Sequence, residues 1–553
     1  MPGKPKGKRA DMLKRPINTP YLTIPVSLLL GTLFLGYAPA LAETPAAPDA
    51  APALESAAQE PTFTIKRFVI EGSTLFTPEE LSGLVVSFVG RRKTSADVEG
   101  ARDALERFFH EGGYPTVMVN IPEQAVENRV IRLVVVENPV RNVTVTGNRW
   151  FSTDKILRDL PSIAPGQVVD LGQLQVEANR LNRHPDFKMM PEMKPGKVPE
   201  TVDILVTVKD KSPWHGSVEV NNRSSHDTTD LRLNASLRHD NLWQKEHSLS
   251  ASYQLSPEKP EEVQVVSGSY TLPAPWGGDG KLVGYGVWSN NDTVSGGGFK
   301  NLGKGYIFGA RAIQPLPPVG GYSHSAVAGV DYKDFTETTG LLGGAGESLP
   351  VKYLPFSVAY SSSLPDSRGA TSFNAALNVS FRGLVAMPRE FEDKRFHSRA
   401  NYMFLTAGLE RLQRLPGDFS LLVRLDGQVS DQPLVSNEQY SAGDADSVRG
   451  YRESEASGDN AIHGVFELAA PSLLKGEGSA LVPYLFFEGA GLFVKEPLPG
   501  QEERIGLKGT GFGVRGTLFG SLEFQTDLGF ALMDAGRTEK GDSRLHFKVK
   551  WQF

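Results

Sequence analysis

The second part of the chain, residues 211–553, is dominated by apolar and polar residues that alternate in segments of about ten residues. Segments 231–238 and 419–429 show the alternation clearly. Because successive side chains of a strand point to opposite faces, each segment is predicted to be a strand with one apolar face. There are roughly sixteen segments, an even number that favours an antiparallel transmembrane β-barrel with a water-filled lumen. A soluble multi-sandwich protein is the competing fold.

The last segment ends the chain with alternating apolar residues, several of them aromatic. The polar positions between them include His546, which is predicted to face away from the apolar side. A terminal aromatic residue directly after such a strand is typical of the closing strand of a bacterial outer-membrane barrel. We therefore expect a lipid-facing C-terminal barrel signal that consists of Phe547, Trp551 and Phe553.

Residues 62–210 show helical spacing and divide into two similar units. Each is predicted to open with a short strand and a glycine turn, followed by a helix whose N-cap is Thr77 or Ser152. Pro78 at the first helical position and Glu80 in a capping box strengthen the first of these predictions. The matching positions of the two units are Gly72 and Gly147, Phe76 and Phe151, Thr77 and Ser152, and Leu81 and Ile156.

Each unit is predicted to contain a second helix and to end on strands. In the first unit the helix ends at Gly112–Gly113 and is followed by strands over 115–121 and 130–137. In the second unit a helix around 174–181 precedes a strand over 202–208. The pattern predicts tandem α+β modules over 62–138 and 139–210, with two unrelated α+β modules as the alternative. The apolar face of the first unit's second helix is predicted to hold Val98, Ala101, Leu105 and Phe108.

The first 42 residues have the features of a signal peptide. Six basic residues precede an apolar stretch from Tyr21 to Tyr37, and Ala40–Leu41–Ala42 offers a small-x-small cleavage site. An uncleaved anchor helix is the alternative, although the apolar stretch is at the short limit for a membrane span. Residues 43–61 are rich in alanine, proline and acidic residues, which predicts a flexible leader with a short helix over 54–59.

Composition and motifs narrow the functional classes. The formal net charge of −6 gives no reason to expect a nucleic-acid partner, and the absence of cysteine excludes disulfides and thiolate metal sites. The histidines are scattered and no G-x-S-x-G or H-E-x-x-H string occurs, so we expect no enzyme activity, no metal and no cofactor. Residues 298–305 approach a phosphate loop, but Gly305 stands where the motif needs Ser or Thr, and we predict a hairpin turn.

A long connection from about Asp431 to Asp459 contains the segment EQYSAGDADSVRGYRESEASGDN. Its Val448–Arg449–Gly450–Tyr451 string matches the VRGY motif of the two-partner secretion transporters, the haemolysin activation/secretion family of the POTRA-barrel superfamily. The resemblance covers nearly the whole mature chain. It implies that 62–138 and 139–210 are POTRA domains 1 and 2, and that the long connection folds back into the lumen of the barrel.

The resemblance also implies partners for the motif. The family pattern Phe-x-Asp-x-Gly on a later strand is represented by Phe486, Glu488 and Gly491, with Glu in place of Asp and with altered glycine spacing. It implies that Glu488 pairs with Arg449 in the lumen, while an ordinary lumen-facing acid is the alternative. The resemblance is also dense in GYPTVMVNIPEQ, whose candidate substrate-docking residues are Gly113, Tyr114, Pro115, Pro122 and Gln124.

The resemblance implies an outer-membrane transporter that captures an unfolded exoprotein in the periplasm with its POTRA domains and secretes it through the barrel. An exposed sheet edge in each module could accept an incoming segment as an added strand. The expected partners are a large secreted exoprotein, outer-membrane lipid and, during biogenesis, the barrel-assembly machinery and periplasmic chaperones. The alternatives are a barrel-assembly or insertion factor of the same superfamily and a passive porin, which would need neither VRGY nor POTRA modules.

Overall fold

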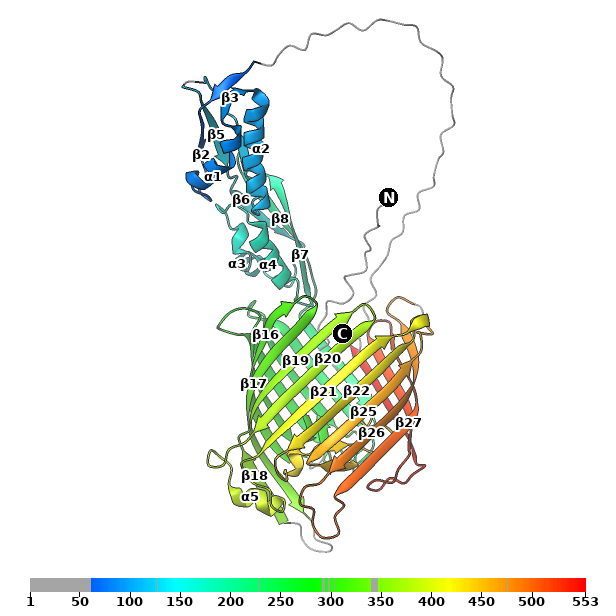
Figure 1. Cartoon of the computed structure of the whole chain (residues 1–553). Helices are drawn as coiled ribbons and strands as arrows, with labels where there is room; N and C mark the ends of the chain where they lie inside the picture. Colours follow the sequence, from blue (N-terminus) through cyan, green and yellow to red (C-terminus); the bar gives the residue numbers. More distant parts are fainter. Residues whose placement is uncertain are drawn as a thin grey trace, which may run out of the picture. The chain divides into compact units, whose positions relative to one another are not determined.

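The computed structural model describes residues 61–553, apart from residues 127, 227, 291–293, 297–298, 303, 340–346 and 475. The described chain divides into two compact units, one that ends at Pro213 and one that runs from Trp214 to Phe553 (Figure 1). The expected signal peptide and all of the expected leader except residue 61 lie outside the described residues. Within the described part, no helix is both long enough and apolar enough to cross a membrane.

The first module of the N-terminal unit is built on a three-stranded sheet in the order β2–β5–β4, in which β2 and β5 are parallel. Its helices pack on this sheet through a core that includes Leu81, Leu105 and Leu133. A short pair of strands, β1 and β3, adds to the predicted elements. The elements are β1 (Phe63–Ile65), β2 (Arg67–Glu71), α1 (Pro78–Leu84), the 3₁₀ helix η2 (Val86–Phe88), β3 (Gly90–Lys93), α2 (Ser95–Glu111), β4 (Met118–Asn120) and β5 (Val130–Val136).

The first helix of this module begins as the sequence predicts. The side chain of Thr77 caps α1 by accepting the N–H of Glu80, and the Glu80 carboxylate accepts the N–H of Thr77 at 2.9 Å. One core position differs from the prediction, because Phe109 is fully buried and Phe108 only partly. Phe109 lies four residues after Leu105 and therefore shares its face of the helix.

The second module repeats this plan with the sheet order β6–β8–β7, in which β6 and β8 are parallel. Ser152 caps its first helix as predicted, by accepting the N–H of Lys155 at 3.2 Å. The strand β7 is an element that the sequence analysis did not identify. The elements are β6 (Val140–Thr146), α3 (Thr153–Arg158), η3 (Pro161–Ile163), α4 (Leu171–Leu181), β7 (Phe187–Pro195) and β8 (Val202–Asp210).

A glycine turn is held in the same way in both modules. Gly72 and Gly147 have positive φ angles of +91° and +83°, and a Cβ on either would lie 2.3 Å from a carbonyl oxygen of the adjacent strand. Only glycine fits such a position. A carboxylate at the end of that strand then accepts N–H groups of the turn: Glu137 accepts two and Asp210 accepts three. The repeat is thus conserved between the modules in its contacts as well as in its order of elements.

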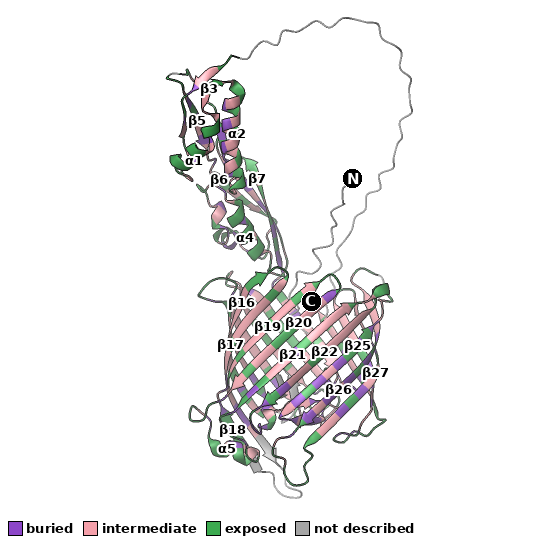
Figure 2. Cartoon of the chain, in the orientation of Figure 1, coloured by how far each residue is buried: buried purple, intermediate pink, exposed green. Residues whose placement is uncertain are grey.

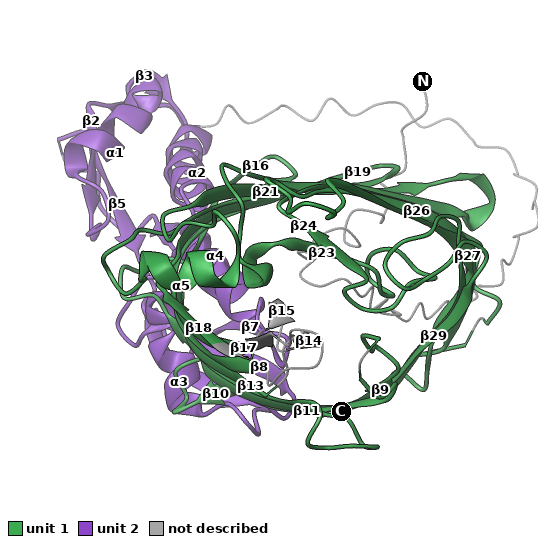
Figure 3. Ribbon diagram, turned by 90° about the horizontal axis from the view of Figure 1, so that it is seen from below, with its two compact units in different colours: residues 1–28, 214–553 green, residues 29–213 purple. Residues whose placement is uncertain are grey.

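The second unit is a closed antiparallel β-barrel, seen along its axis in Figure 3. Because β18 and β19 pair with successive parts of β17, its described strands occupy sixteen positions around the ring, as predicted. The barrel strands are β9 (Trp214–Asn221), β10 (Arg232–Leu242), β11 (His247–Leu255), β12 (Gln264–Pro273), β13 (Lys281–Ser289), β16 (Lys304–Val319), β17 (Tyr322–Thr339), β18 (Glu347–Tyr353), β19 (Phe356–Asp366), β20 (Gly369–Val379), β21 (Met403–Arg414), β22 (Ser420–Ser430), β25 (Asn460–Ala469), β26 (Ala480–Phe493), β27 (Arg504–Leu518), β28 (Leu522–Ala531) and β29 (Ser543–Gln552).

Smaller elements lie in the connections between barrel strands. Within the segment 298–305, which was predicted to be a hairpin turn, the described residues are the strand β15 (Phe299–Leu302), which pairs with β14 (Val294–Gly296), and the start of β16 at Lys304. Residues 298 and 303 lie outside the described residues. The connection between β20 and β21 carries α5 (Pro388–Lys394), whose Phe391 is buried in an apolar cluster with Tyr353 and Tyr402. The remaining elements are η4 (Pro416–Asp418), η5 (Ser436–Glu438), β23 (Tyr440–Ala442) and β24 (Ala456–Gly458).

The barrel closes where β29 meets β9, and the C-terminal residue takes part in the closure. The ladder runs from the Gln552–Ser217 pair to the Lys548–Asn221 pair. Phe553 exchanges backbone hydrogen bonds with Gly216 at 3.0 and 3.2 Å, and its ring occupies the space that a Cβ on Gly216 would take. Phe553 and Trp551 are exposed on the outer face, and Phe547 shares that face by alternation.

Candidate functional site

The long connection runs from residue 431 to residue 459, between β22 and β25. Within it, residues 440–442 (β23) pair with residues 456–458 (β24), and this pair of strands lies inside the ring of barrel strands in Figure 3. Buried positions on β25 and β26 are visible on the barrel wall in Figure 2. The connection, called the VRGY loop below, therefore occupies the lumen.

Arg449 is held by the carboxylate of Glu488 on β26. Its backbone N–H donates to Oε2 at 2.8 Å, its Nε donates to Oε1 at 2.9 Å, and its Nη2 forms a further close ion pair with Oε1. Both residues are almost fully buried, at 3% and 2% exposure. The structure thus brings together the two residues that the resemblance paired, with the guanidinium and the main chain of the loop on one carboxylate.

Two further acids, which the sequence analysis did not single out, converge on the same guanidinium. Nη1 of Arg449 lies 3.1 Å from Asp527 on β28 and 3.4 Å from Glu467 on β25. Arg515 on β27 reaches the other oxygen of Glu467 at 2.6 Å. The site, called the acid cluster below, therefore sets three buried carboxylates against two arginines.

Aromatic rings complete the pocket around Arg449. The guanidinium carbon lies 3.5 Å from the centre of the Phe486 ring, a cation–π contact, and Tyr484 donates a short hydrogen bond to Asp527. Arg515 lies 4.6 Å from the ring of Tyr484 on the same side of the wall. Phe486 thus packs against Arg449 on the strand that also carries Glu488.

Glycines in the wall allow the loop backbone to approach it. A Cβ on Gly509 of β27 would lie 2.2 Å from the carbonyl oxygen of Arg449, and a Cβ on Gly529 of β28 would lie 2.5 Å from the nitrogen of Gly450. Gly450 itself has a φ of +104°, which favours glycine. The motif glycine and the wall glycines are therefore needed for the same close contact.

The other motif residues contact strands at the closing side of the barrel. Val448 and Tyr451 are fully buried. The hydroxyl oxygen of Tyr451 lies 2.8 Å from the carbonyl oxygen of Met533 and 3.0 Å from that of Lys508, and its single O–H donates within this pair. The N–H of Gly450 donates to Nε2 of His546 at 3.4 Å. All four motif residues thus contact the wall.

Beyond the motif, the loop is attached to two neighbouring connections, 222–231 and 532–542. Glu455, whose side chain is fully buried, accepts a hydrogen bond from His226 and from the N–H of Arg537 at 2.8 Å. Arg452 forms an ion pair with Asp230 at 3.0 Å. We call these contacts the outer attachment; all three partners lie in connections between barrel strands.

The base of the loop is fixed by Asp459, which has no exposed surface. Its carboxylate accepts the N–H of Leu434 at 2.8 Å and the N–H of Lys495 at 2.7 Å, and it forms an ion pair with Arg395 at 2.9 Å. Asp459 therefore joins both ends of the loop to the neighbouring connections.

One predicted lumenal residue lies on the other face. Gly491 is on β26 as expected, but it pairs with Ile462, whose side chain is exposed on the outside of the barrel. Ala490, not Gly491, alternates inward with Phe486 and Glu488 and is buried in the cluster around Tyr451. Ala490 thus occupies the place that glycine holds in the family pattern.

The candidate docking residues lie between α2 and β5 of the first module. Gly113 accepts the N–H of Leu171 in the second module at 2.9 Å, and Tyr114 packs edge-on against Phe76. Pro115 and Pro122 are partly exposed. The side-chain oxygen of Gln124 accepts the N–H of Arg132 on β5 at 2.7 Å, and its NH₂ group donates to the carbonyl oxygen of Arg132 at 2.9 Å. This side chain therefore already has partners.

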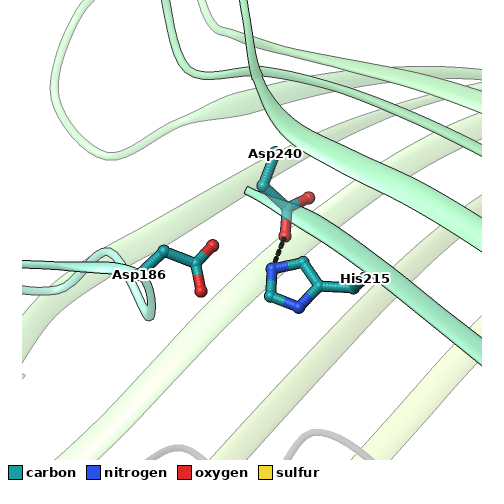
Figure 4. A group of neighbouring side chains, drawn as sticks. All are labelled: Asp186, His215 and Asp240. Atoms are coloured by element: carbon teal, nitrogen blue, oxygen red, sulfur yellow. Dashed lines mark ion pairs between the residues drawn. The ribbon is translucent and has the colours of Figure 1, made fainter. Parts of the chain in front are cut away.

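Figure 4 draws a group of His and Asp side chains near the start of the barrel. Within the barrel unit, His215 and Asp240 form an ion pair at 3.5 Å. Asp186, drawn beside them, belongs to the other unit, whose position relative to the barrel is not determined. The group therefore carries no argument for a metal site.

Known families match most of this architecture. A model of the POTRA domain, ShlB-type, matches residues 63–138, and a model of the haemolysin secretion/activation protein ShlB/FhaC/HecB matches residues 200–279 and 348–516. The outer membrane transporter CdiB of Dickeya dadantii is 22% identical over 425 residues, which cover 74% of this chain and 72% of that protein. The heme/hemopexin transporter protein HuxB of Haemophilus influenzae is 21% identical over 428 residues, which cover 75% and 74%.

Solved structures show the same fold. CdiB from Escherichia coli has a TM-score of 0.58 at 18% identity, and the match covers 91% of this chain and 93% of that one. BamA from Haemophilus ducreyi without its POTRA domains 1–3 has a TM-score of 0.54 at 14% identity, covering 89% and 100%. With its POTRA module, its sixteen-position barrel and these family matches, the chain belongs to the haemolysin secretion/activation family, the outer-membrane transporters of two-partner secretion.

Proposed function

We propose that the POTRA modules capture one large unfolded exoprotein in the periplasm and that the barrel passes it outward as an extended chain, without nucleotide, cofactor or catalysis. The observation that supports this most directly is the VRGY loop in the lumen, where all four motif residues contact the wall. A passive porin needs no such loop. Folding of the exoprotein outside the cell, from where it cannot return, is the proposed driving force.

A strain that lacks this protein tests the proposal. We expect a single large protein to disappear from the medium and to return when the intact gene is supplied. A barrel-assembly factor, which the likeness to BamA in fold leaves as the second candidate, would instead lower the amounts of several outer-membrane proteins. Unchanged secretion together with lower permeability to small solutes would favour a porin.

We further propose that the first module recognises the exoprotein. Its strand β4 lies at the edge of the sheet and is followed by exposed apolar residues, among them Ile121 and Val126. Such an edge can accept an extended segment as an additional strand once the Glu106 carboxylate releases the N–H of Val119, which it accepts at 3.0 Å. Removal of residues 62–138 should abolish pull-down of the exoprotein's N-terminal domain while the barrel still inserts. Retained binding by the shortened protein would contradict this assignment.

For biogenesis we propose that the barrel-assembly machinery, supported by periplasmic chaperones, recognises the aromatic C-terminal strand. Phe553 stabilises the closing strands through its backbone bonds with Gly216. Deletion of Phe553 should lower the amount of heat-modifiable barrel in the outer membrane. Phe519→Ala is a matched control, because that ring is 83% exposed in the turn between β27 and β28 and takes no part in the β29–β9 ladder. Equal barrel levels in the two variants would refute the role of Phe553.

A further inference from the structure

Six serines line the lumen face of four adjacent strands, β9 to β12. Three pairs of hydroxyl groups face each other across neighbouring strands. The oxygen–oxygen distance is 2.8 Å for Ser217 and Ser236, 2.8 Å for Ser250 and Ser269, and 2.6 Å for Ser252 and Ser267. Their lumen orientation follows from the alternation, since Val218, Leu237, Leu249 and Val266 on the opposite face are 41–50% exposed and apolar. We call this surface the serine wall; its members are Ser217, Ser236, Ser250, Ser252, Ser267 and Ser269.

The hydroxyl pairs keep hydrogen-bonding capacity that the wall itself does not use. In a pair of hydroxyls one O–H donates to the other oxygen, so the second O–H and several lone pairs stay available. A hydroxyl rotates to act as donor or acceptor as its neighbour requires. The serine wall can therefore bond both the N–H and the C=O groups of a polypeptide backbone, whatever its sequence.

The serine wall is also hollowed. A cavity of about 190 Å³ lies against it and is lined by Ser217, Ser236, Ser252, Asn234 and Gln254. Two charged residues at its margin, Glu219 and Lys550, face each other across the closing strands and carry opposite charges. Apart from Ala235 and Val265 the lining is polar, and its two charges balance.

The opposite arrangement is found at the acid cluster. There the wall carries Glu467, Glu488 and Asp527, and the VRGY loop covers them. A chain that moved along that wall would have to displace the loop and would bind or be repelled according to its own charge. Small neutral side chains, in contrast, let a backbone approach closely without holding it at one position.

We propose that the serine wall is the surface along which the extended backbone of the exoprotein slides during secretion, while the loop-covered wall of β25–β28 stays out of contact. This deepens, and rests on, the proposed function. The surface would recognise peptide groups rather than a sequence, which suits a substrate whose every segment must pass the same point.

The absence of cysteine from the chain makes a direct test possible. Ser252→Cys and Ser267→Cys each place one thiol on the serine wall, and Gln525→Cys places one on the lumen face of β28 next to Asp527. The probe is the protein that disappears from the medium of the deletion strain. A tightly folding domain fused to its C-terminus stalls it in the barrel, and the stalled segment carries one cysteine. A short bismaleimide cross-links the two thiols. For each variant, the cross-linking yield is divided by the fraction of the barrel thiol that a small soluble maleimide labels, which corrects for differences in accessibility.

We expect the normalised yield at positions 252 and 267 to exceed that at position 525 several-fold. An equal or higher yield at 525 would overturn the proposal while the proposed function stands, since secretion is scored separately. If the deletion removes no protein from the medium, the proposed function itself fails.

A pair of variants adds an independent readout. The double variant Ser252→Asp/Ser267→Asp sets two negative charges on the wall and should lower secretion several-fold, with unchanged heat-modifiability of the barrel. The double variant Ser252→Thr/Ser267→Thr keeps both hydroxyls and should secrete at nearly the normal rate. Normal secretion by the aspartate variant would contradict the proposal, and so would a loss in the threonine variant as large as that in the aspartate variant.

Discussion

The VRGY loop is attached to the barrel at two regions that use opposite chemistry. At the acid cluster, a loop cation, Arg449, is held by carboxylates that project from three barrel strands. At the outer attachment, a loop anion, Glu455, is held by His226 and by the backbone N–H of Arg537, both of which lie in connections. The first region is built on strands that the barrel ladder fixes, and the second is built on segments with fewer constraints.

This difference indicates which attachment determines the position of the loop. The partners of Arg449 are fixed by the β-ladder and cannot follow the arginine when the loop moves. Withdrawal of the loop therefore breaks the ion pairs, which is costly in free energy. A charge held by connections can keep its partners through a small shift of both. We therefore infer that the acid cluster acts as the fixed point and that the outer attachment adjusts around it.

The sharpest way to break this comparison is Arg449→Ala, for which we expect the largest effect. Removal of one partner of a buried ion pair costs about 3–5 kcal/mol, because here Glu488 and Asp527 lose their arginine while Glu467 keeps only Arg515. At 3% exposure Arg449 is shielded from the water of the lumen, so solvent screening reduces this value little. The barrel should fold and insert, while secretion falls and the resting conductance in planar bilayers changes.

Arg515→Ala is the matched control for that variant. Arg515 also contacts Glu467, but its side chain is 41% exposed and it belongs to the wall, not to the loop. We expect the loop to stay in place when Arg515 is removed. Equal changes in conductance for the two variants would show that the cluster responds to charge alone and does not anchor the loop through Arg449.

The next largest effect is expected for Glu455→Ala, which removes the acceptor of the outer attachment. Hydrogen bonds to a charged group contribute about 1.5–3 kcal/mol, and the N–H of Arg537 would lose its partner. A spin label on a single thiol, Ala445→Cys, should become more mobile, whereas secretion should fall less than in Arg449→Ala. Glu455→Gln keeps an acceptor, so the mobility of its label should lie between that of Glu455→Ala and that of the parent. If secretion fell further in Glu455→Ala than in Arg449→Ala, the outer attachment and not the acid cluster would be the fixed point.

Gly529→Ala tests the close approach at the acid cluster without changing a charge. The new methyl group would lie 2.5 Å from the nitrogen of Gly450, so loop and wall must separate, at a cost of about 1–3 kcal/mol that is typical of overpacking. Gly489→Ala is the control, because its Cβ would meet the nearest atom at 3.4 Å, an ordinary contact. We expect a change in conductance for Gly529→Ala alone; the same conductance in both would show that the wall glycines are not needed for loop docking.

The smallest effect is expected for Arg452→Ala. Its partner Asp230 has a side chain that is 56% exposed, and exposed ion pairs contribute about 0.2–1 kcal/mol. Salt should weaken this contact while leaving the acid cluster intact. The Ala445 label should therefore gain mobility with salt in the parent protein and little further in Arg452→Ala; a salt response of the same size in both would contradict this.

The same ion pair should depend on pH in one direction. Burial raises the pKa of Asp230, but the hydroxyl of Ser224 and the cations of Arg452 and Arg544 outweigh it and hold that pKa below its usual value. Because the pKa of Asp230 is lowered in the folded state, the ion pair contributes to stability above the ordinary aspartate pKa. This stabilisation is lost as the pH falls through the lowered value. Label mobility should thus rise only in strongly acidic buffer, and a rise near neutral pH would refute the assignment.

The sequence predicts the strands well because the period of two is a local property. The face of each residue in the segments around 231–238 and 419–429 could be assigned from its neighbours alone, and both segments are strands with those faces. The strand Phe187–Pro195 was missed because it contains prolines and lacks a β-branched run. Phe108 was placed on the buried face because three- and four-residue spacings both suit a helix, and only packing decides between them.

The site is less predictable than the fold, because its residues come from different strands. Glu488 was found through the family pattern, whereas Glu467 and Asp527 look like ordinary inward polar positions in their own segments. Their convergence depends on the register between strands, which alternation does not determine and which a shift by two residues would destroy without changing any face. The glycines Gly509 and Gly529 carried the only local signal, since glycine is unusual inside a strand and marks close approach of another backbone.

The acid cluster has a consequence for permeant ions. Glu467, Glu488 and Asp527 share the cluster with two arginines, one of which leaves with the loop. A lumen from which the loop has withdrawn would therefore present three carboxylates beside Arg515 alone, and this ring of the wall would attract cations and exclude anions. Withdrawal of the loop should shift the reversal potential, measured in a salt gradient, toward the equilibrium potential of the cation. Ion selectivity would thus report the position of the loop while a substrate passes.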